Sequence, residues 1–106
     1  MLAGKPVIAT PYGGVTDFVD EQTALPLRYR MVDVGEGNDP YPANGRWADP
    51  ELRSIRAAMR AIYGDRALAR RLAEGGRAHA LALFSLASTS AALKAEIERI
   101  WRSATA

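Results

Sequence analysis

The sequence predicts a protein of the α/β class, with short parallel strands near the N-terminus followed by three main helices. Three observations lead to this prediction. An apolar run at 6–9 is closed by Thr10, Pro11 and a Gly-Gly pair, which is typical of a buried strand that ends in a loop. A second extended segment follows at 24–30. From residue 49 onward, apolar residues recur at helical spacing, and we expect these helices to pack beside the strands.

The residues before the first strand have the features of a helix C-terminus. Gly4 suits the left-handed position just after a helix, Lys5 suits the negative end of the helix dipole, and Pro6 cannot continue the helix. The strand at 7–10 is apolar in composition and is expected to be fully buried. Because a buried strand normally has neighbours, we expect further strands to precede this sequence.

A short helical turn and a second strand are predicted next. Residues 15–19 form the turn, with Asp17 in its first part. Residues 24–30 have the composition of an extended segment. Pro26 has no N–H to donate, so this segment is predicted to be an edge strand or only partly paired.

Residues 31–48 are predicted to form a long loop, because they are rich in Gly, Pro, Asn and Asp and show no periodicity. A structureless loop of that length inside a compact domain is uncommon, and it is often functional or packed on another domain. Asp49 and Pro50 then predict the N-cap and first residue of a helix. We therefore assign 49–102 as a helical region.

Three helices are expected within this region, each with its apolar residues on one face. The faces comprise Leu52, Ile55, Met59, Ile62 and Tyr63 in the first helix, Leu68, Leu72, His79 and Leu83 in the second, and Leu86, Leu93, Ile97 and Ile100 beside Trp101 in the third. Asp65 and Ser85 are expected to begin the second and third helices. Gly75 and Gly76 cost about 1 kcal/mol each in helix propensity relative to Ala, and they predict a kink or the close approach of another backbone.

Composition excludes several classes of function. The chain has 106 residues and a net charge of +2, which is too weakly basic to indicate a nucleic-acid or membrane-surface partner. It has no Cys and a single His, which excludes disulfides, thiolate sites and multi-His metal clusters and leaves only a carboxylate site open. No metal or cofactor is predicted. We expect no signal peptide or membrane span, and a soluble, cytoplasmic protein.

Several segments together resemble the C-terminal part of a group 1 (GT4-type) glycosyltransferase. They are GKPVIATPYGGVTDFVDEQTALPLRYRMVDVG, then YPANGRWADPE, then a helix that ends in Ala-Leu-Phe-Ser, and they cover nearly the whole chain. The resemblance implies the GT-B architecture of two Rossmann-like halves, in which the C-terminal half binds a nucleotide-sugar donor. It also implies a retaining transfer without a bound metal. We interpret 1–106 as a truncated piece of that donor-side domain.

The resemblance also implies what this sequence lacks. The family marks its donor site with two glutamates separated by seven residues, and the second comes three residues before the segment that is here Leu2-Ala3-Gly4. Both would therefore lie upstream of Met1, with the acceptor domain and the basic residues that neutralise the diphosphate. No catalytic residue is assigned, and the isolated chain is predicted to be inactive. The expected partners are the missing N-terminal portion of the enzyme and, only in the full-length enzyme, the nucleotide-sugar donor.

The candidate donor-binding residues are Thr10, Pro11, Tyr12, Gly13 and Gly14. Glycines allow backbone to approach a ligand, and the N–H groups of the following turn can face an anion. The alternative is a tight strand-to-helix turn that only requires positive φ.

For the remaining candidates we favour structural roles. Asp17 matches the family's acidic position after Gly-Gly, and we interpret it as a helix cap. His79 is interpreted as a packed residue at the core edge, and Trp47 and Trp101 as anchors. The arginine stripes (53, 56 and 60; 66, 70 and 77) are interpreted as solvated faces, because acidic residues interrupt them at 51, 65 and 74.

A second hypothesis is a small helical interaction or nucleic-acid-binding module without catalysis. It predicts no ordered strand at 7–10 and a compact three-helix bundle from residue 50. The first hypothesis also predicts self-association of the fragment. The open edge of the strand at 7–10 and the apolar face of the last helix would both lack their partners.

Overall fold

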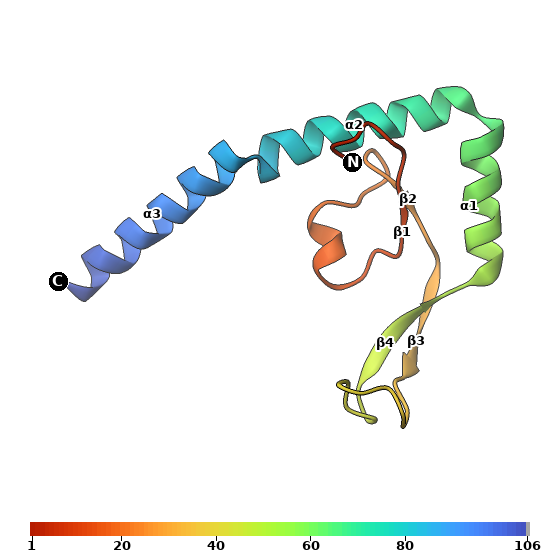
Figure 1. Cartoon of the computed structure of the whole chain (residues 1–106), viewed down its shortest axis with the longest axis horizontal. Coiled ribbons are helices and arrows are strands. Elements are labelled where there is room, and N and C mark those ends of the chain that lie inside the picture. The colour runs from red at the N-terminus through yellow and green to blue at the C-terminus, as the bar shows by residue number, and fades with distance from the viewer. Residues whose placement is uncertain (106) are drawn as a thin grey trace.

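The computed structural model describes residues 1–105 and is a mixed α/β structure with two separate two-stranded sheets and three helices (Figure 1). In chain order the elements are β1 (Ile8–Ala9), the 3-10 helix η1 (Gly13–Asp17), β2 (Leu25–Pro26), β3 (Tyr29–Asp33), β4 (Arg46–Pro50), α1 (Leu52–Gly64), α2 (Arg66–Phe84) and α3 (Leu86–Ala104). The predicted α/β class, with short parallel strands before three helices, is confirmed at this level.

β1 and β2 form the parallel pair that the sequence predicts. The N–H of Leu25 donates to the Val7 carbonyl and the N–H of Leu27 donates to the Ala9 carbonyl, each at 2.9 Å. Pro26 lies between these two donors, at the position whose N–H would point away from β1, so its lack of a donor costs no ladder bond. β1 has two half-buried residues instead of the four fully buried ones predicted, because it has one neighbouring strand.

The predicted loop at 31–48 is wrong at both ends, which belong to a β-hairpin. β3 and β4 pair antiparallel from Tyr29 opposite Pro50 to Asp33 opposite Arg46. The irregular connection is confined to 34–45, which contains all the Gly and Pro residues that suggested a loop. The hairpin projects away from α2 (Figure 1).

The predicted start of the first long helix is also wrong. Asp49 and Pro50 are the last residues of β4, and the N-cap of α1 is Glu51, whose backbone is extended (φ −69°, ψ 123°). The Asp49 carboxylate accepts hydrogen bonds from Arg30 across the hairpin instead of capping the helix. Strand pairing therefore overrides a local Asp-Pro pattern that usually begins a helix.

The predicted start of the second helix near Asp65 and the predicted cap at Ser85 are both confirmed. An Asp65 carboxylate oxygen accepts from the N–H of Leu68 at 2.9 Å, at the start of α2. The Ser85 hydroxyl oxygen accepts from the N–H of Ser88 at 3.2 Å, at the start of α3. Because Ser85 itself has an extended backbone (φ −69°, ψ 157°), it separates α2 from α3.

The small core lies where α2 crosses the loop before β2. Leu72 of α2 is 1% exposed, and Thr23 of the loop is 3% exposed. A Cβ added at Gly76 would lie 2.8 Å from the backbone oxygen of Thr23, and one at Gly75 would meet the backbone oxygen of Gln22. The paired glycines therefore allow the close backbone approach that the sequence predicts.

The molecule is elongated, and much apolar surface stays open. Its radius of gyration is 18.4 Å, against about 13 Å for a compact domain of this length. α3 extends from the end of α2 away from the strands (Figure 1). Its apolar residues are 52–86% exposed: Leu86, Leu93, Ile97, Ile100 and Trp101. On α1, Leu52, Met59 and Tyr63 are exposed as well. The expected packing of the helices beside the strands is therefore absent for α3 and for these residues of α1, and the exposed face of α3 agrees with the prediction that it lacks a partner in this chain.

One helical stretch, Arg66–Ala104, is long and apolar enough to cross a membrane by length and composition. Its most apolar window has a mean hydropathy of 1.3 and is 6% buried. Ser85 divides the stretch into two helices of 19 residues, each about 28 Å long. One such stretch is weak evidence for a membrane span, so the expected absence of a span stays a prediction.

Candidate functional site

The residues of the predicted donor-binding turn lie together on the surface, from the end of β1 into the first two residues of η1. Thr10 and Pro11 are half-buried, and Tyr12, Gly13 and Gly14 are exposed. Gly13 has a φ of +61°, which favours glycine at that position. A Cβ at Gly13 or Gly14 would have no atom within 4 Å, so this backbone faces open space. The turn is therefore open to a ligand, and only Gly13 is required by the backbone conformation.

Few chemical groups surround this turn. The Tyr12 ring meets the Tyr29 ring edge to face, with 5.8 Å between centroids. The Thr16 hydroxyl donates to the Gly13 carbonyl at 2.7 Å, which holds the start of η1 in place. The five residues of η1 include no acidic residue in the first turn and no basic residue in the last. The turn offers backbone groups, the Thr10 hydroxyl and the Tyr12 phenol, and its five residues include no carboxylate, imidazole or amine side chain.

The predicted capping role of Asp17 is wrong. Asp17 is the last residue of η1, and the N-cap position is Tyr12, which makes no side-chain capping bond. Asp17 instead borders an apolar groove of about 580 Å³ beside the end of α2, lined by Met1, Leu2, Val7, Asp17, Phe18, Ala80 and Phe84. Within it, the rings of Phe18 and Phe84 meet edge to face at 6.0 Å. This groove contains a single carboxylate and no other charged side chain.

His79 and the two tryptophans differ in how far they match their predicted structural roles. His79 is half-buried, with its ring 6.2 Å from the Phe84 ring, as expected for a core-edge residue. Trp47 is 36% exposed and meets the Tyr41 ring edge to face at 6.0 Å, so it braces the hairpin connection against β4. Trp101 is 70% exposed, so its predicted anchoring role is wrong for this chain alone.

Metal ligands do not gather anywhere in residues 1–105: no group of three or more His, Asp or Glu side chains is placed to hold an ion there.

The turn before β2 is held by Asp20. One carboxylate oxygen accepts from the N–H of Gln22 at 2.8 Å and from the N–H of Thr23 at 2.9 Å. The bond from Gln22 is the main reason that the pKa of Asp20 lies below its ordinary value. The buried Thr23 hydroxyl donates to the Phe18 carbonyl at 3.1 Å. The role of this cluster is structural, because it shapes the loop against which the two glycines of α2 pack.

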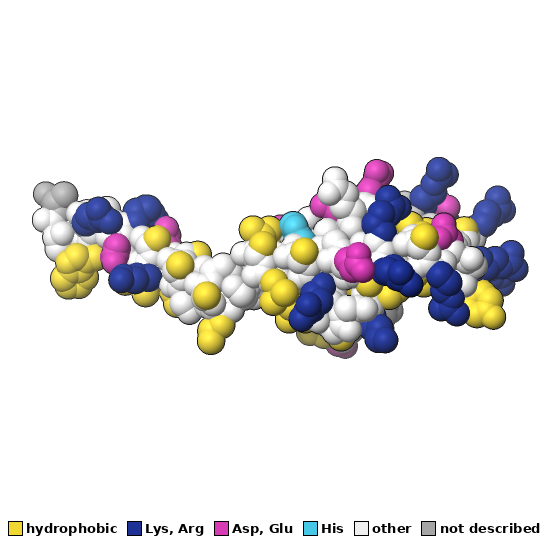
Figure 2. Space-filling model, turned by 90° about the horizontal axis from the view of Figure 1, so that it is seen from above, with side chains coloured by type: hydrophobic (Ala, Val, Ile, Leu, Met, Phe, Trp, Pro, Cys, Tyr) yellow, Lys and Arg dark blue, Asp and Glu magenta, His cyan; other side chains and the backbone are white. Residues whose placement is uncertain are grey.

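A second depression, which no pattern in the sequence predicts, lies where the hairpin meets α1. This groove of about 760 Å³ is lined by Arg28, Arg30, Asp49, Pro50, Glu51, Leu52, Arg53 and Arg56. Figure 2 shows that Lys and Arg side chains gather at the end of the molecule that α1 and the start of α2 form. The sequence pattern keeps these arginines apart, because residues 31–48 have the composition of a long loop where the hairpin joins them. The one available signal was the extended segment at 24–30, which contains Arg28 and Arg30.

Comparison of this chain with protein-family profiles, with curated proteins and with solved structures finds no match.

Proposed function

We propose that this chain is the donor-side, C-terminal part of a retaining glycosyltransferase that transfers a sugar from a nucleotide-sugar donor to an acceptor, and that the isolated chain is inactive. The proposal starts from the sequence resemblance over nearly the whole chain. It assigns Thr10, Pro11, Tyr12, Gly13 and Gly14 to the wall of the donor cleft, and it assigns no catalytic residue.

The observation that carries the proposal is the open turn at the carboxyl end of a parallel strand. β1 pairs in parallel with β2, and the turn that begins at Thr10 follows β1 directly. In open α/β sheets, ligands bind at this edge. The positive φ of Gly13 and the empty space beside Gly14 leave the backbone accessible there. This arrangement supports a cleft-lining role for the turn.

The alternative of a small helical module receives less support. That hypothesis expects no strand at 7–10 and a compact bundle of three helices. β1 is present at Ile8–Ala9, and α3 extends away from the other two helices (Figure 1). We therefore retain the glycosyltransferase proposal, with the N-terminal portion of the enzyme as the partner that completes the donor site.

Two experiments test the proposal. Purified chain is incubated with UDP-, GDP- and ADP-sugars, and release of nucleoside diphosphate is measured; we expect none above a blank, because catalysis by positioning requires both sides of the cleft. The coding DNA upstream of Met1 is then read for an in-frame extension that encodes two glutamates separated by seven residues. Turnover by the isolated chain contradicts its predicted inactivity, and the absence of such an extension contradicts the proposal itself.

A matched pair of variants tests the role of the turn, in the protein that includes the in-frame extension with the two glutamates. Gly13→Val places a β-branched residue at a φ of +61°, and Gly37→Val does the same at +80° in the hairpin connection, each with open space around the new side chain. We expect Gly13→Val to lower sugar transfer and Gly37→Val to leave it unchanged. Equal activity of the two variants would remove the turn from the donor site.

A further inference from the structure

Arginines from two distant parts of the sequence meet at the groove between the hairpin and α1. The Arg28 N–H donates to the Ser54 hydroxyl, and the Glu51 N–H donates to the Arg28 carbonyl, both at 2.9 Å. Strand pairing places Arg30 opposite Asp49. These bonds fix residues 28–30 beside the first turn of α1, so that Arg28 and Arg30 share the groove with Arg53 and Arg56.

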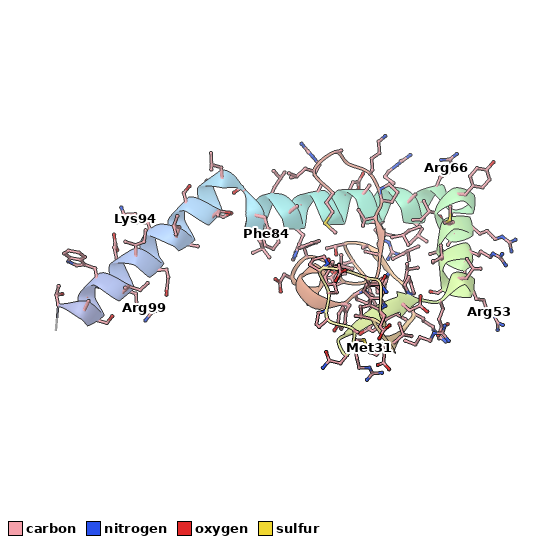
Figure 3. The ribbon with its side chains drawn as sticks, turned by 60° about the horizontal axis from the view of Figure 1, so that its bottom comes forward. Met31, Arg53, Arg66, Phe84, Lys94 and Arg99 are labelled. Atoms are coloured by element: carbon pink, nitrogen blue, oxygen red, sulfur yellow. The ribbon has the colours of Figure 1, made fainter. Side chains whose placement is uncertain are left out.

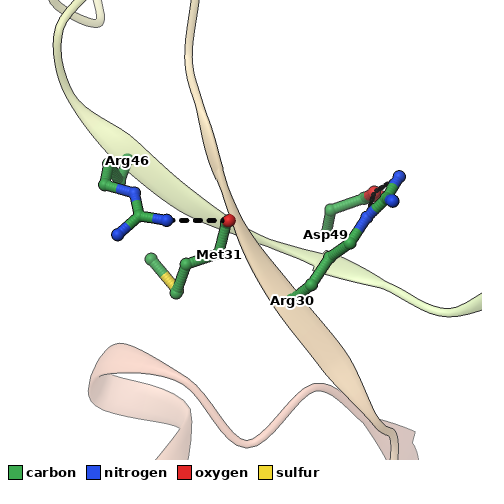
Figure 4. Close-up of polar contacts among 4 residues, drawn as sticks. All are labelled: Arg30, Met31, Arg46 and Asp49. Atoms are coloured by element: carbon green, nitrogen blue, oxygen red, sulfur yellow. Dashed lines mark hydrogen bonds and ion pairs between the residues drawn. The ribbon is translucent and has the colours of Figure 1, made fainter.

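The charges in this groove are unbalanced. Asp49 is occupied by Arg30, whose Nε and Nη2 both donate to one carboxylate oxygen at 3.1 Å (Figure 4). Within residues 1–105, Arg28, Arg53 and Arg56 form no ion pair. Figure 3 shows Arg53 at the start of α1. Glu51 is the remaining carboxylate, so the four arginines and two carboxylates that line the groove leave a net charge of +2.

The first turn of α1 adds backbone donors to the same place. Its N-cap, Glu51, makes no side-chain capping bond. Leu52 and Arg53, the first two residues of this 13-residue helix, line the groove, and their N–H groups have no partner in residues 1–105. Uncapped N–H groups and the helix dipole both favour an anion. This contribution supplements the arginines, which carry the argument.

We propose that this groove binds a small, phosphate-rich anion carrying at least two phosphoryl groups. Guanidinium groups match phosphate oxygens in a planar, two-pronged geometry, and three unpaired ones are available here. A volume of about 760 Å³ lies within the range of small-molecule sites. The Glu51 carboxylate in the groove lining would repel a long polyanion that ran across the surface. The groove is separate from the Thr10–Gly14 turn, and the proposal does not depend on sugar transfer.

The test titrates the purified chain with sodium tripolyphosphate by calorimetry. The groove variant is Arg53→Gln/Arg56→Gln. The control is Arg70→Gln/Arg71→Gln, which removes the same charge from two exposed residues of α2 that lie outside the groove. We expect the groove variant to bind at least about tenfold more weakly, and the control to change affinity by less than about threefold. Circular dichroism confirms that both variants stay folded.

Glu51→Gln makes the groove more positive, whereas the groove variant makes it less positive. Because it removes the one unpaired carboxylate from the groove, we expect it to tighten tripolyphosphate binding by about threefold or more. Equal weakening in the groove variant and the control overturns the proposal in favour of diffuse surface charge. Absence of detectable binding at millimolar tripolyphosphate overturns it as well. Tighter binding of a single-stranded oligonucleotide, weakened equally by both variants, would identify a nucleic-acid surface instead.

Discussion

The contact between α2 and the loop before β2 predicts an unusual response to alanine. In an exposed helix interior, Gly→Ala normally stabilises a protein by about 0.5–1 kcal/mol, through the entropy of the unfolded chain. At Gly75 and Gly76 the added Cβ would instead meet the backbone oxygens of Gln22 and Thr23. We therefore expect both substitutions to destabilise the fold, against the helix propensity of alanine.

The magnitude follows from the geometry. At Gly76 the new Cβ would lie 2.8 Å from the Thr23 oxygen, a separation that real Cβ atoms essentially never show. The loop cannot yield freely, because the Thr23 N–H and hydroxyl are both hydrogen-bonded within it. Overpacking of this kind costs about 1–3 kcal/mol. After the gain from helix propensity, we expect a net loss of about 1–2 kcal/mol for Gly76→Ala and at least as much for Gly75→Ala, whose contact is closer.

Urea unfolding followed by circular dichroism measures the effect as a shift of the midpoint at constant slope. Gly64→Ala is the matched control, because Gly64 lies in α1 with no atom within 4 Å of its added Cβ. We expect that variant to be neutral or more stable by up to about 1 kcal/mol. The reasoning fails if Gly75→Ala or Gly76→Ala is as stable as Gly64→Ala, since the close approach would then be absent in solution.

Three further predictions concern other parts of the chain. Trp47→Ala is expected to cost about 1 kcal/mol in urea unfolding, because the ring is 36% exposed and its aromatic contact is with Tyr41; a cost of 3 kcal/mol or more, about that of a buried tryptophan, would place the ring in a core. The pKa of Asp20 is lowered in the folded state, so the ionised carboxylate stabilises the fold. This stabilisation is complete above the unfolded-state pKa of about 4 and is lost as the pH falls through the folded-state pKa. Asp20→Asn should therefore lose less stability than the wild type between about pH 5 and pH 2, and equal losses would show that Asp20 does not contribute. Ile97→Glu on the exposed face of α3 should weaken the predicted self-association more than Ile8→Lys in β1, because the α3 side chain is exposed and the β1 side chain is half-buried. Light scattering after size-exclusion chromatography measures the oligomeric state. A wild-type monomer at about 10–100 μM would contradict the predicted self-association.

The sequence predicted those elements whose signals are local. The Asp65 and Ser85 caps depend on residues three positions apart, and the close approach at Gly75–Gly76 is indicated by the glycines themselves. β1 pairs with a strand 17 positions further along the chain, and each of these two strands has its own local signal in composition. Local propensity is sufficient for such features.

The sequence failed where pairing across the chain overrides a local pattern. The β3–β4 hairpin joins Arg30 to Asp49, and no periodicity within 31–48 announces this contact. The Asp-Pro pattern at Asp49 therefore predicts a helix start that does not form there, and without the hairpin no pattern brings the groove arginines together. Within the candidate site, the sequence predicted the residues of the turn from Thr10 to Gly14. Whether this turn is open to solvent depends on how the rest of the chain packs around it, and the local sequence pattern does not encode that packing.

The break at Ser85 has a consequence for the local stability of the chain. Because every apolar side chain of α3 is exposed, this helix depends mainly on its own hydrogen bonds and on i, i+4 pairs such as Lys94 with Glu98. Most of the stability of a helix in a protein comes from the tertiary packing of its apolar face, and that face of α3 is exposed. In the monomer we therefore expect α3 to form and melt as a separate cooperative unit, without unfolding the strands. Its backbone amides should exchange with deuterium far faster than that of Leu72 in α2, and its helicity should fall gradually with temperature, ahead of the main transition.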